Sequence, residues 1–340
     1  MTANDFKNNL KKLSGGYLFC GEENYLKSHY LSAARKETVS EGDFFNHIII
    51  NADGYTPDVL ASAMESLPVM ADKKLIELTG LPLDDMNSDE IDDLCTVLDL
   101  LPQYEYNVLI IYTETDEFDC GTQKQPSALM KTLSSHIAPV VFSRETPARL
   151  ASWIAKHFAS EKIIACPCEV DALIDRCGCD MFTLSSEIEK LCWYLKSQGR
   201  EKLTADDVKN VSSESKEIAA FDLANSILGG KADDAFSILK ELKLRKEKPE
   251  IILFGISRVI CDLLLVKAIA ENGGSAQTVS KKMKMHEYKA GLYFRASSRC
   301  DGNKLRSIAR ECADADMLIK SSQIDSYTVL DRLAALASSR

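Results

Sequence analysis

The first 143 residues alternate short apolar runs with segments of helical pattern, and this alternation constrains the fold more than any other feature. Three of the apolar runs contain almost no polar residue, as expected of strands that are covered on both faces in a parallel sheet. Residues 1–143 are therefore predicted to form a doubly wound α/β domain. The predicted strands are Tyr17–Cys20, His47–Asn51, Lys74–Thr79, Val108–Tyr112 and Val140–Phe142, with helices predicted at residues 23–40, 56–67, 87–101 and 126–135.

The turn after the first predicted strand is where nucleotide-binding proteins of this architecture carry a phosphate-binding loop. Such a loop needs glycines that expose backbone N–H groups, a lysine that neutralises phosphate and a hydroxyl that binds Mg²⁺. Here Gly21 is followed by Glu22 and Glu23, whose carboxylates would repel a phosphate. Lys27 is the one candidate cation, and no adjacent Ser/Thr-Gly cradle accompanies it. We therefore predict no nucleotide cofactor, and a divergent nucleotide hydrolase is kept as an alternative.

Strand signals stop after Phe142, and the remaining residues show helical patterns. A compact group of helical segments extends to residue 211 and predicts an all-α domain over residues 144–211. The polar segment Ser212–Glu217 separates it from further helical patterns, which are interrupted by Gly-Gly pairs. A second all-α domain is predicted over residues 212–340.

The chain has a formal net charge of −10, which is unevenly distributed. Residues 1–140 carry a balance of −13, whereas the remaining residues carry +3. The acidic first domain offers no electrostatic footprint for DNA, so DNA contacts are expected behind residue 140. No run approaches the ~20 apolar residues of a membrane-spanning helix, and no membrane partner is expected. The polar N-terminus and the eleven scattered cysteines favour reduced thiols in the cytoplasm.

Two closely spaced cysteine pairs, Cys166/Cys168 and Cys177/Cys179, suggest a zinc site because four thiolates can bind zinc tetrahedrally. Zinc ligands more often follow a Cys-x-x-Cys spacing, and Cys177 continues an apolar helical stripe. Buried or incidental thiols are the favoured interpretation, and a zinc-dependent helical adaptor remains an alternative. The five histidines lie far apart and no Gly-x-Ser-x-Gly motif occurs, so no catalytic residue is predicted.

Apolar residues occupy a turn between a predicted helix and the third predicted strand, where polar residues are more usual. Pro68 ends the helix, which leaves Leu67, Val69 and Met70 at the end of the sheet. These side chains could pack under the edge of the sheet. They could equally form an exposed apolar tip that inserts into a pocket of a partner protein.

Several motifs, in order along nearly the whole chain, resemble the delta subunit of the bacterial DNA polymerase III clamp loader. The resemblance implies an AAA+-like first domain with a RecA-type parallel sheet and a degenerate phosphate-binding loop, followed by a helical lid and a helical collar. It agrees with the missing Gly-Lys-Ser/Thr sequence. The motifs are YLFCGEENYL, SLPVMADKKLIEL, CGCDMFTLSSEIEKL and FDLANSILGGKADDAFSILKELKLRKEKPEIILFGISR.

The same resemblance implies a non-catalytic subunit of a DNA-directed DNA polymerase (nucleotidyltransferase) holoenzyme in DNA replication. The family's delta subunit binds the beta sliding clamp and opens one interface, so that the clamp can be loaded on primed DNA. Carried over by position, the clamp-binding pair is Val69 and Met70, with Leu67 as support, where the family commonly has Leu-Phe or Phe-Phe. Other implied partners are the gamma/tau and delta-prime subunits, reached through the collar, and primed-template DNA within the complex.

Overall fold

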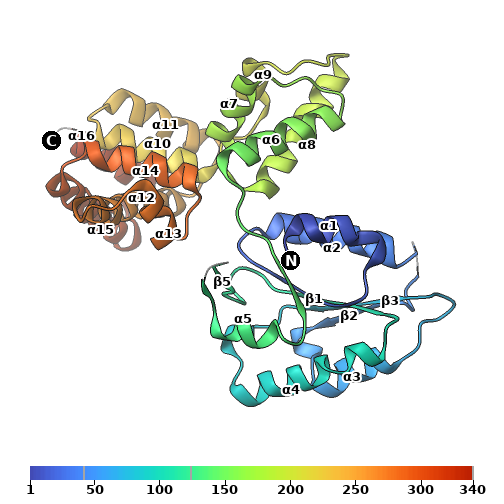
Figure 1. The fold of residues 1–340 in the computed structure, drawn as a ribbon. Helices are drawn as coiled ribbons and strands as arrows, with labels where there is room; N and C mark the ends of the chain where they lie inside the picture. The colour runs from blue at the N-terminus through green and yellow to red at the C-terminus, as the bar shows by residue number, and fades with distance from the viewer. Residues whose placement is uncertain (41–42, 123–124, 339–340) are drawn as a thin grey trace. The chain divides into compact units, whose positions relative to one another are not determined.

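The computed structural model describes the whole chain except residues 41–42, 123–124 and 339–340 (Figure 1). The chain separates into two compact units, Met1–Glu145 and Thr146–Arg340. The first unit is the predicted α/β domain, and the second is helical. Division of the second unit into a lid and a collar domain stays a prediction.

A five-stranded parallel sheet forms the centre of the first unit, with the strand order β2-β3-β4-β1-β7 among the described residues. Every strand predicted from an apolar run is present, with ends that shift by two residues at most. The strands are β1 (Gly15–Cys20), β2 (His47–Asn51), β3 (Lys74–Thr79), β4 (Asn107–Tyr112) and β7 (Ala138–Val141). The crossover between β1 and β2 places β3 and β4 between them in the sheet, as in doubly wound domains.

Helices cover both faces of this sheet, which explains why β1, β4 and β7 are almost entirely apolar (Figure 1). In β1, Leu18 packs with the helices of one face and Phe19 with those of the other. The helices are α1 (Ala3–Asn9) and α2 (Asn24–Thr38) on one face, and α3 (Pro57–Glu65), α4 (Ser88–Leu98) and α5 (Ala128–Leu133) on the other. Short 3-10 turns lie at Leu10–Lys12, Ala52–Gly54, Leu83–Asp85 and Leu101–Gln103.

Local sequence signals account for the ends of the helices that approach the candidate site. Thr56 caps α3 by accepting the Val59 N–H, and Pro57 occupies the first helical position. Two elements of this unit were not predicted: helix α1, and a short antiparallel hairpin of β5 (Gly121–Thr122) and β6 (Gln125–Pro126). The Phe6 side chain of α1 is buried in the core, where its aromatic ring packs edge-on against that of Phe19.

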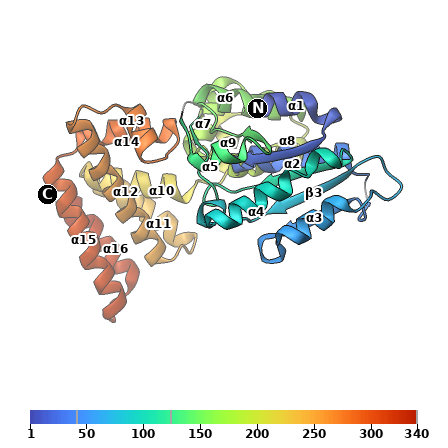
Figure 2. The same cartoon turned by 60° about the horizontal axis from the view of Figure 1, so that its bottom comes forward.

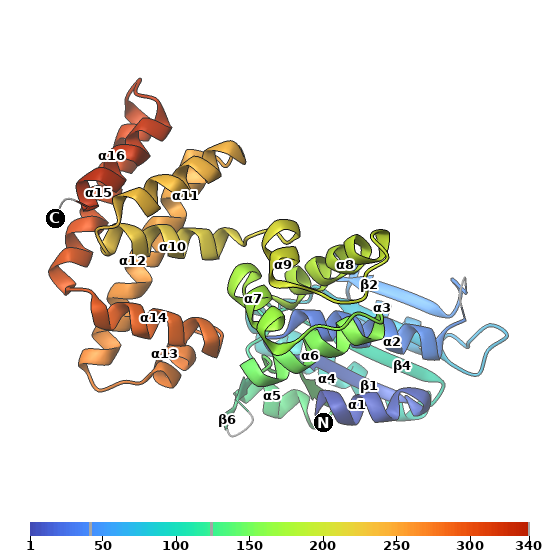
Figure 3. The same cartoon turned by 90° about the horizontal axis from the view of Figure 1, so that it is seen from above.

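The second unit is helical in its described residues apart from one isolated β-bridge between Ile164 and Lys202, and α12 is central to its C-terminal part. This helix packs against α10, α14 and α15 (Figure 3). No helix of the described residues is long and apolar enough to span a membrane. The helices are α6 (Pro147–Ser160), α7 (Pro167–Cys177), α8 (Met181–Ser197), α9 (Ala205–Val211), α10 (Lys216–Leu228), α11 (Ala232–Leu244), α12 (Pro249–Glu271), α13 (Ala276–Lys282), α14 (Glu287–Arg299), α15 (Gly302–Ser321) and α16 (Ser326–Ser338).

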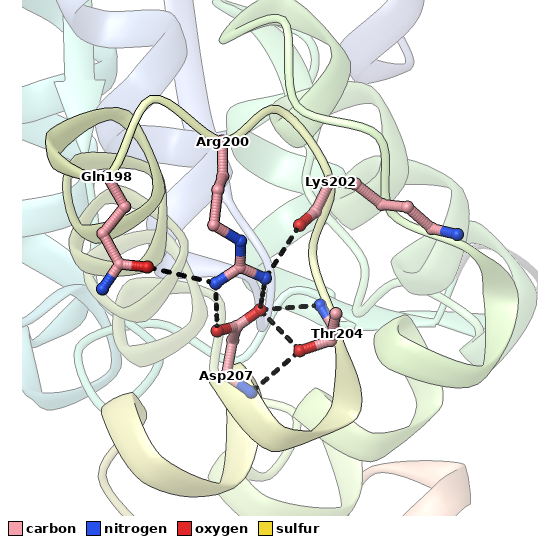
Figure 4. Close-up of polar contacts among 5 residues, drawn as sticks. All are labelled: Gln198, Arg200, Lys202, Thr204 and Asp207. Carbon is pink, nitrogen blue, oxygen red and sulfur yellow. Dashed lines mark hydrogen bonds and ion pairs between the residues drawn. The ribbon is translucent and has the colours of Figure 1, made fainter.

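An ion pair closes the connection between α8 and α9 (Figure 4). Arg200 donates through Nη1 and Nη2 to the two carboxylate oxygens of Asp207, at 2.8 and 2.7 Å. Asp207 also accepts from the Thr204 backbone N–H and hydroxyl at the start of α9. These donors hold the pKa of Asp207 at about 2, and the Arg200 guanidinium is the largest cause. The contacts stabilise the connection between α8 and α9.

Candidate functional site

The residues singled out from the sequence lie in the connection between α3 and β3, which projects past the start of β3 (Figure 2). We call residues 67–70 the apolar tip. Leu67 is 74% exposed, Val69 is 51% exposed and Met70 is fully exposed. Of the two interpretations, packing under the sheet edge is therefore wrong for these side chains. All three side chains are therefore on the surface of the first unit.

The backbone of the tip is fixed by a buried side chain from the neighbouring strand. Asn46 immediately precedes β2 and is 1% exposed. Its Oδ1 accepts the Val69 N–H at 2.7 Å, and its Nδ2 donates to the Val69 carbonyl at 2.8 Å. Both polar groups of one tip residue are thus satisfied by a single amide, which leaves the apolar side chains on an ordered backbone.

The end of α3 is fixed by a second buried polar residue, Lys74, at the start of β3. Its ammonium donates to the carbonyl of Ala63, to that of Ser66 and, at 2.8 Å, to the Ser66 hydroxyl. These carbonyls lie at the C-terminal end of α3, where no following N–H group of the helix can donate to them. Burial lowers the pKa of Lys74 to about 8. Asn107 reinforces the same helix end by donating to the Met64 carbonyl at 3.0 Å.

Met70 has a positive φ of 51°, in the left-handed region that side chains with a Cβ rarely occupy. This conformation costs about 1–2 kcal/mol for a residue other than glycine. Such a conformation persists only where neighbouring contacts fix the chain, and the Asn46 contacts to Val69 do so here. It aims the Met70 side chain fully into solvent.

The turn where a phosphate-binding loop would lie is at the opposite end of the strands and is closed by the backbone of the chain. The Glu23 N–H donates to the Phe142 carbonyl at 3.0 Å, so this N–H group cannot bind a phosphate. Gly21 has a φ of 109°, and a Cβ at this position would lie 2.5 Å from the same carbonyl oxygen. Gly21 is therefore required by the close approach of residue 142 rather than by a ligand.

Lys27, the cation that a divergent nucleotide hydrolase would need, is fully buried beneath that turn. Its Nζ donates to the carbonyls of Gly21 at 2.8 Å and Thr113 at 2.6 Å. Burial is the main cause that lowers the pKa of this lysine. Its ammonium joins the backbone at the ends of β1 and β4. No observation on the described residues therefore favours the hydrolase alternative.

The four cysteines of the possible zinc site do not converge. Cys166 precedes the first residue of α7 and Cys177 is its last, so about 15 Å of helix separates them. Cys177 is buried at 2% exposure, as its place in the apolar stripe predicted, whereas Cys168 is exposed. The described residues contain no group of histidine, cysteine and acidic side chains that could bind a metal ion. The zinc-dependent adaptor therefore lacks a site in them.

Sequence reasoning found the tip but missed the residues that position it. Asn46 and Lys74 each stand next to or at the start of a strand, where polar residues usually face water, and both are instead buried. The available signal was the position of these residues in the sequence. Because β2 and β3 pair in parallel, both strands begin at the same edge of the sheet, and the residues at their starts lie close together. Polar side chains that precede neighbouring strands can therefore contact the same turn.

Two family models match the chain. The model described as "DNA polymerase III, delta subunit" matches residues 17–141, and "DNA polymerase III delta subunit, C-terminal domain" matches residues 217–335. The DNA polymerase III subunit delta of Bacillus subtilis is 24% identical over 325 residues, which cover 93% of this chain and 90% of the relative. The subunit delta of Escherichia coli is 22% identical over 315 residues, which cover 91% of this chain and 87% of the relative.

The same architecture occurs in a solved structure, that of the Bacillus subtilis DNA clamp loader delta protein. It superposes on this chain with a TM-score of 0.76 at 21% sequence identity, and the match covers 99% of this chain and 100% of that protein. The fold of the α/β unit and that of the helices that follow it are therefore both shared with that protein. At this level of identity, the likeness is evidence for the fold.

Proposed function

The chain belongs to the family of DNA polymerase III delta subunits, and on that premise we propose that it works as the clamp loader subunit that binds the beta sliding clamp and opens one interface. The contact is made by Val69 and Met70, with Leu67 as support. The chain has no catalytic step of its own in this proposal. It uses binding energy alone to favour an open clamp that can pass onto primed DNA during replication.

The observation that carries the proposal is the exposed apolar tip on an ordered backbone. An exposed methionine is unremarkable by itself, but three neighbouring apolar side chains on a fixed turn are suited to fill a hydrophobic pocket. Burying a Val or Met side chain contributes about 1.5–3 kcal/mol. Since about 1.4 kcal/mol changes affinity tenfold, the pair can account for a hundredfold or more of the binding constant.

Opening of the clamp follows from differential affinity. A ligand shifts a conformational equilibrium only by the difference between its affinities for the two states. The tip therefore favours the open clamp to the extent that its pocket fits Val69 and Met70 better in that state. An ordered tip helps because little further conformational entropy is lost on binding.

The helical second unit supplies the remaining contacts in this proposal. Residues 212–340, of which 217–335 match the family's C-terminal model, would form the collar that meets the gamma/tau and delta-prime subunits. In this proposal the other subunits bind the nucleotide, since in this chain the turn at Gly21 is closed and the Lys27 ammonium is bound by backbone carbonyls. Contacts to primed-template DNA within the complex come from residues after 140, where the acidic excess of the first unit ends.

The proposal is tested by surface-capture binding of the full chain to the sliding clamp from the same genome, without ATP. The unaltered chain is expected to bind, and Val69→Ser/Met70→Ser is expected to weaken binding by about tenfold or more. Both positions are exposed, so the double variant is expected to keep its fold, and circular dichroism checks this. Failure of the unaltered chain to bind would overturn the proposed role, and binding unaffected by the double variant would move the site elsewhere.

A further inference from the structure

Two adjacent phenylalanines with solvent-exposed side chains, Phe44 and Phe45, lie just before β2. Their exposed fractions are 87% and 77%, so neither side chain contributes appreciably to the core. Leaving an aromatic side chain of this size in water forgoes the free energy that its burial would release. We call these two residues the phenylalanine pair.

The phenylalanine pair is attached to the tip through the next residue. Asn46 follows Phe45 directly, with about 3.8 Å between the two Cα atoms. The same Asn46 side chain accepts the Val69 N–H at 2.7 Å and donates to the Val69 carbonyl at 2.8 Å. Strands β2 and β3 pair in parallel, so both segments also leave the same edge of the sheet. The segments that carry the pair and the tip are therefore joined at this edge of the sheet.

The backbone that carries the pair is ordered as well. Asp43 Oδ1 accepts the N–H groups of Phe45 and Asn46, both at 3.2 Å, in the manner of an Asx turn. Asp43 Oδ2 accepts from Asn46 Nδ2 at 2.5 Å. One amide side chain is therefore shared between the turn that carries the pair and the turn that carries the tip.

The clustering of exposed apolar side chains at this edge distinguishes it from ordinary surface exposure. Among the described residues of the first unit, most large exposed hydrophobic side chains belong to the two segments that Asn46 joins, and the others lie singly. The side chains in the two segments are Phe44, Phe45, Leu67, Val69 and Met70, and the others are Met1, Ile49 and Val59. A concentrated apolar surface of this kind marks a binding site for a protein.

We propose that Phe44 and Phe45 form a second apolar element of the sliding-clamp-binding surface, beside the tip. This inference rests on the proposed function and names further residues of the same contact. The sliding clamp is the occupant because the pair is continuous with the tip through Asn46, so a protein bound over Val69 and Met70 reaches it. The pair also supplies flat aromatic area, which the tip lacks and which is enriched at the energetic centres of interfaces.

The test measures the affinity of the full chain for the sliding clamp by surface capture, without ATP, for three double variants. Phe44→Ser/Phe45→Ser is expected to bind about tenfold or more weakly than the unaltered chain. Val69→Ser/Met70→Ser reports on the tip in the same series. Phe182→Ser/Phe254→Ser is the matched control, since Phe182 and Phe254 are 48% and 63% exposed in the second unit, and it should stay within about twofold.

The outcomes separate this inference from the proposed function. If Val69→Ser/Met70→Ser weakens binding but Phe44→Ser/Phe45→Ser does not, the inference is overturned and the proposed function stands. If the unaltered chain does not bind, both are overturned. Should the double phenylalanine variant lose its circular dichroism spectrum, Phe44→Ser alone decides, since its side chain is the more exposed. Sedimentation of the chain alone tests the rival occupant: self-association removed by Phe44→Ser/Phe45→Ser, with clamp affinity unchanged, would assign the pair to a second copy.

Discussion

Replacing Asn46 by alanine should release the tip without altering any apolar side chain. The substitution removes the acceptor of the Val69 N–H and the donor to the Val69 carbonyl, and it also removes the donor to Asp43. A hydrogen bond between neutral groups contributes about 1 kcal/mol to stability. The two bonds between Asn46 and Val69 therefore correspond to a loss of about 2 kcal/mol around this turn.

The affinity for the sliding clamp should fall because the tip then has to be ordered on binding. Fixing the backbone of one residue costs about 1–2 kcal/mol, which corresponds to a loss of about 5–30-fold in affinity. Met70 adds to the effect, since its positive φ of 51° relaxes once Val69 is free.

Hydrogen exchange followed by mass spectrometry is the direct assay of this release. The Val69 amide donates to Asn46 in the unaltered chain, so peptides covering residues 66–73 should exchange about tenfold faster or more in Asn46→Ala. Asn272→Ala is the matched control, because it removes one amide-to-carbonyl bond of 2.8 Å at the end of α12. Exchange and clamp affinity that both stay unchanged in Asn46→Ala would refute the argument that this residue orders the tip.

Two further substitutions test other parts of the account. Lys27→Met should lower the free energy of unfolding by about 1–3 kcal/mol, because the carbonyls of Gly21 and Thr113 lose a buried donor. A titration with a fluorescent ATP analogue should give no binding in either the unaltered chain or this variant, and saturable binding that Lys27→Met abolishes would restore the hydrolase alternative. The pKa of Asp207 is held at about 2, below its ordinary value of 3.8, so its contribution to stability is complete above pH 3.8 and is lost as the pH falls towards 2. Acid unfolding should therefore show a shallower dependence on pH in this window for Asp207→Asn, and an identical dependence in both proteins would contradict the assignment.

The strands could be predicted because their sequences satisfy one demand, that of burial on two faces. In β4, for example, Leu109 packs with one layer of helices and Ile110 with the other, so no polar alternation is possible. Helix α1 was missed because its sequence, ANDFKNN, contains only Phe6 as a large apolar residue. Its Thr2–Asp5 capping box is a local signal that could have indicated a helix start.

The tip could be located from the sequence, but its exposure could not. Apolar residues after Pro68 are compatible with a buried or an exposed turn, and the difference depends on Asn46, which lies 23 residues earlier in the chain. Only the pairing of β2 with β3 brings that side chain to Val69. The link between the phenylalanine pair and the tip depends on the same long-range arrangement, so no local pattern predicts it.

For the cysteine pairs, the spacing in the sequence suggests one metal site, but the fold keeps the cysteines apart. Cys166 and Cys177 differ by 11 positions, which a flexible loop could bring together around one ion. A continuous helix instead keeps them at opposite ends of α7. The buried Cys177 could be predicted from its helical stripe, because that argument uses the local period alone.

We propose that this chain opens the sliding clamp by binding energy through its tip. Opening can be followed with a sliding clamp that carries a self-quenching dye pair across one interface, mixed with the full chain in the absence of ATP. Fluorescence should rise and saturate with the chain, and the rise should be absent with Val69→Ser/Met70→Ser at the same concentration. Saturated binding without any change in fluorescence would contradict the claim, because the tip would then bind closed and open clamps equally well.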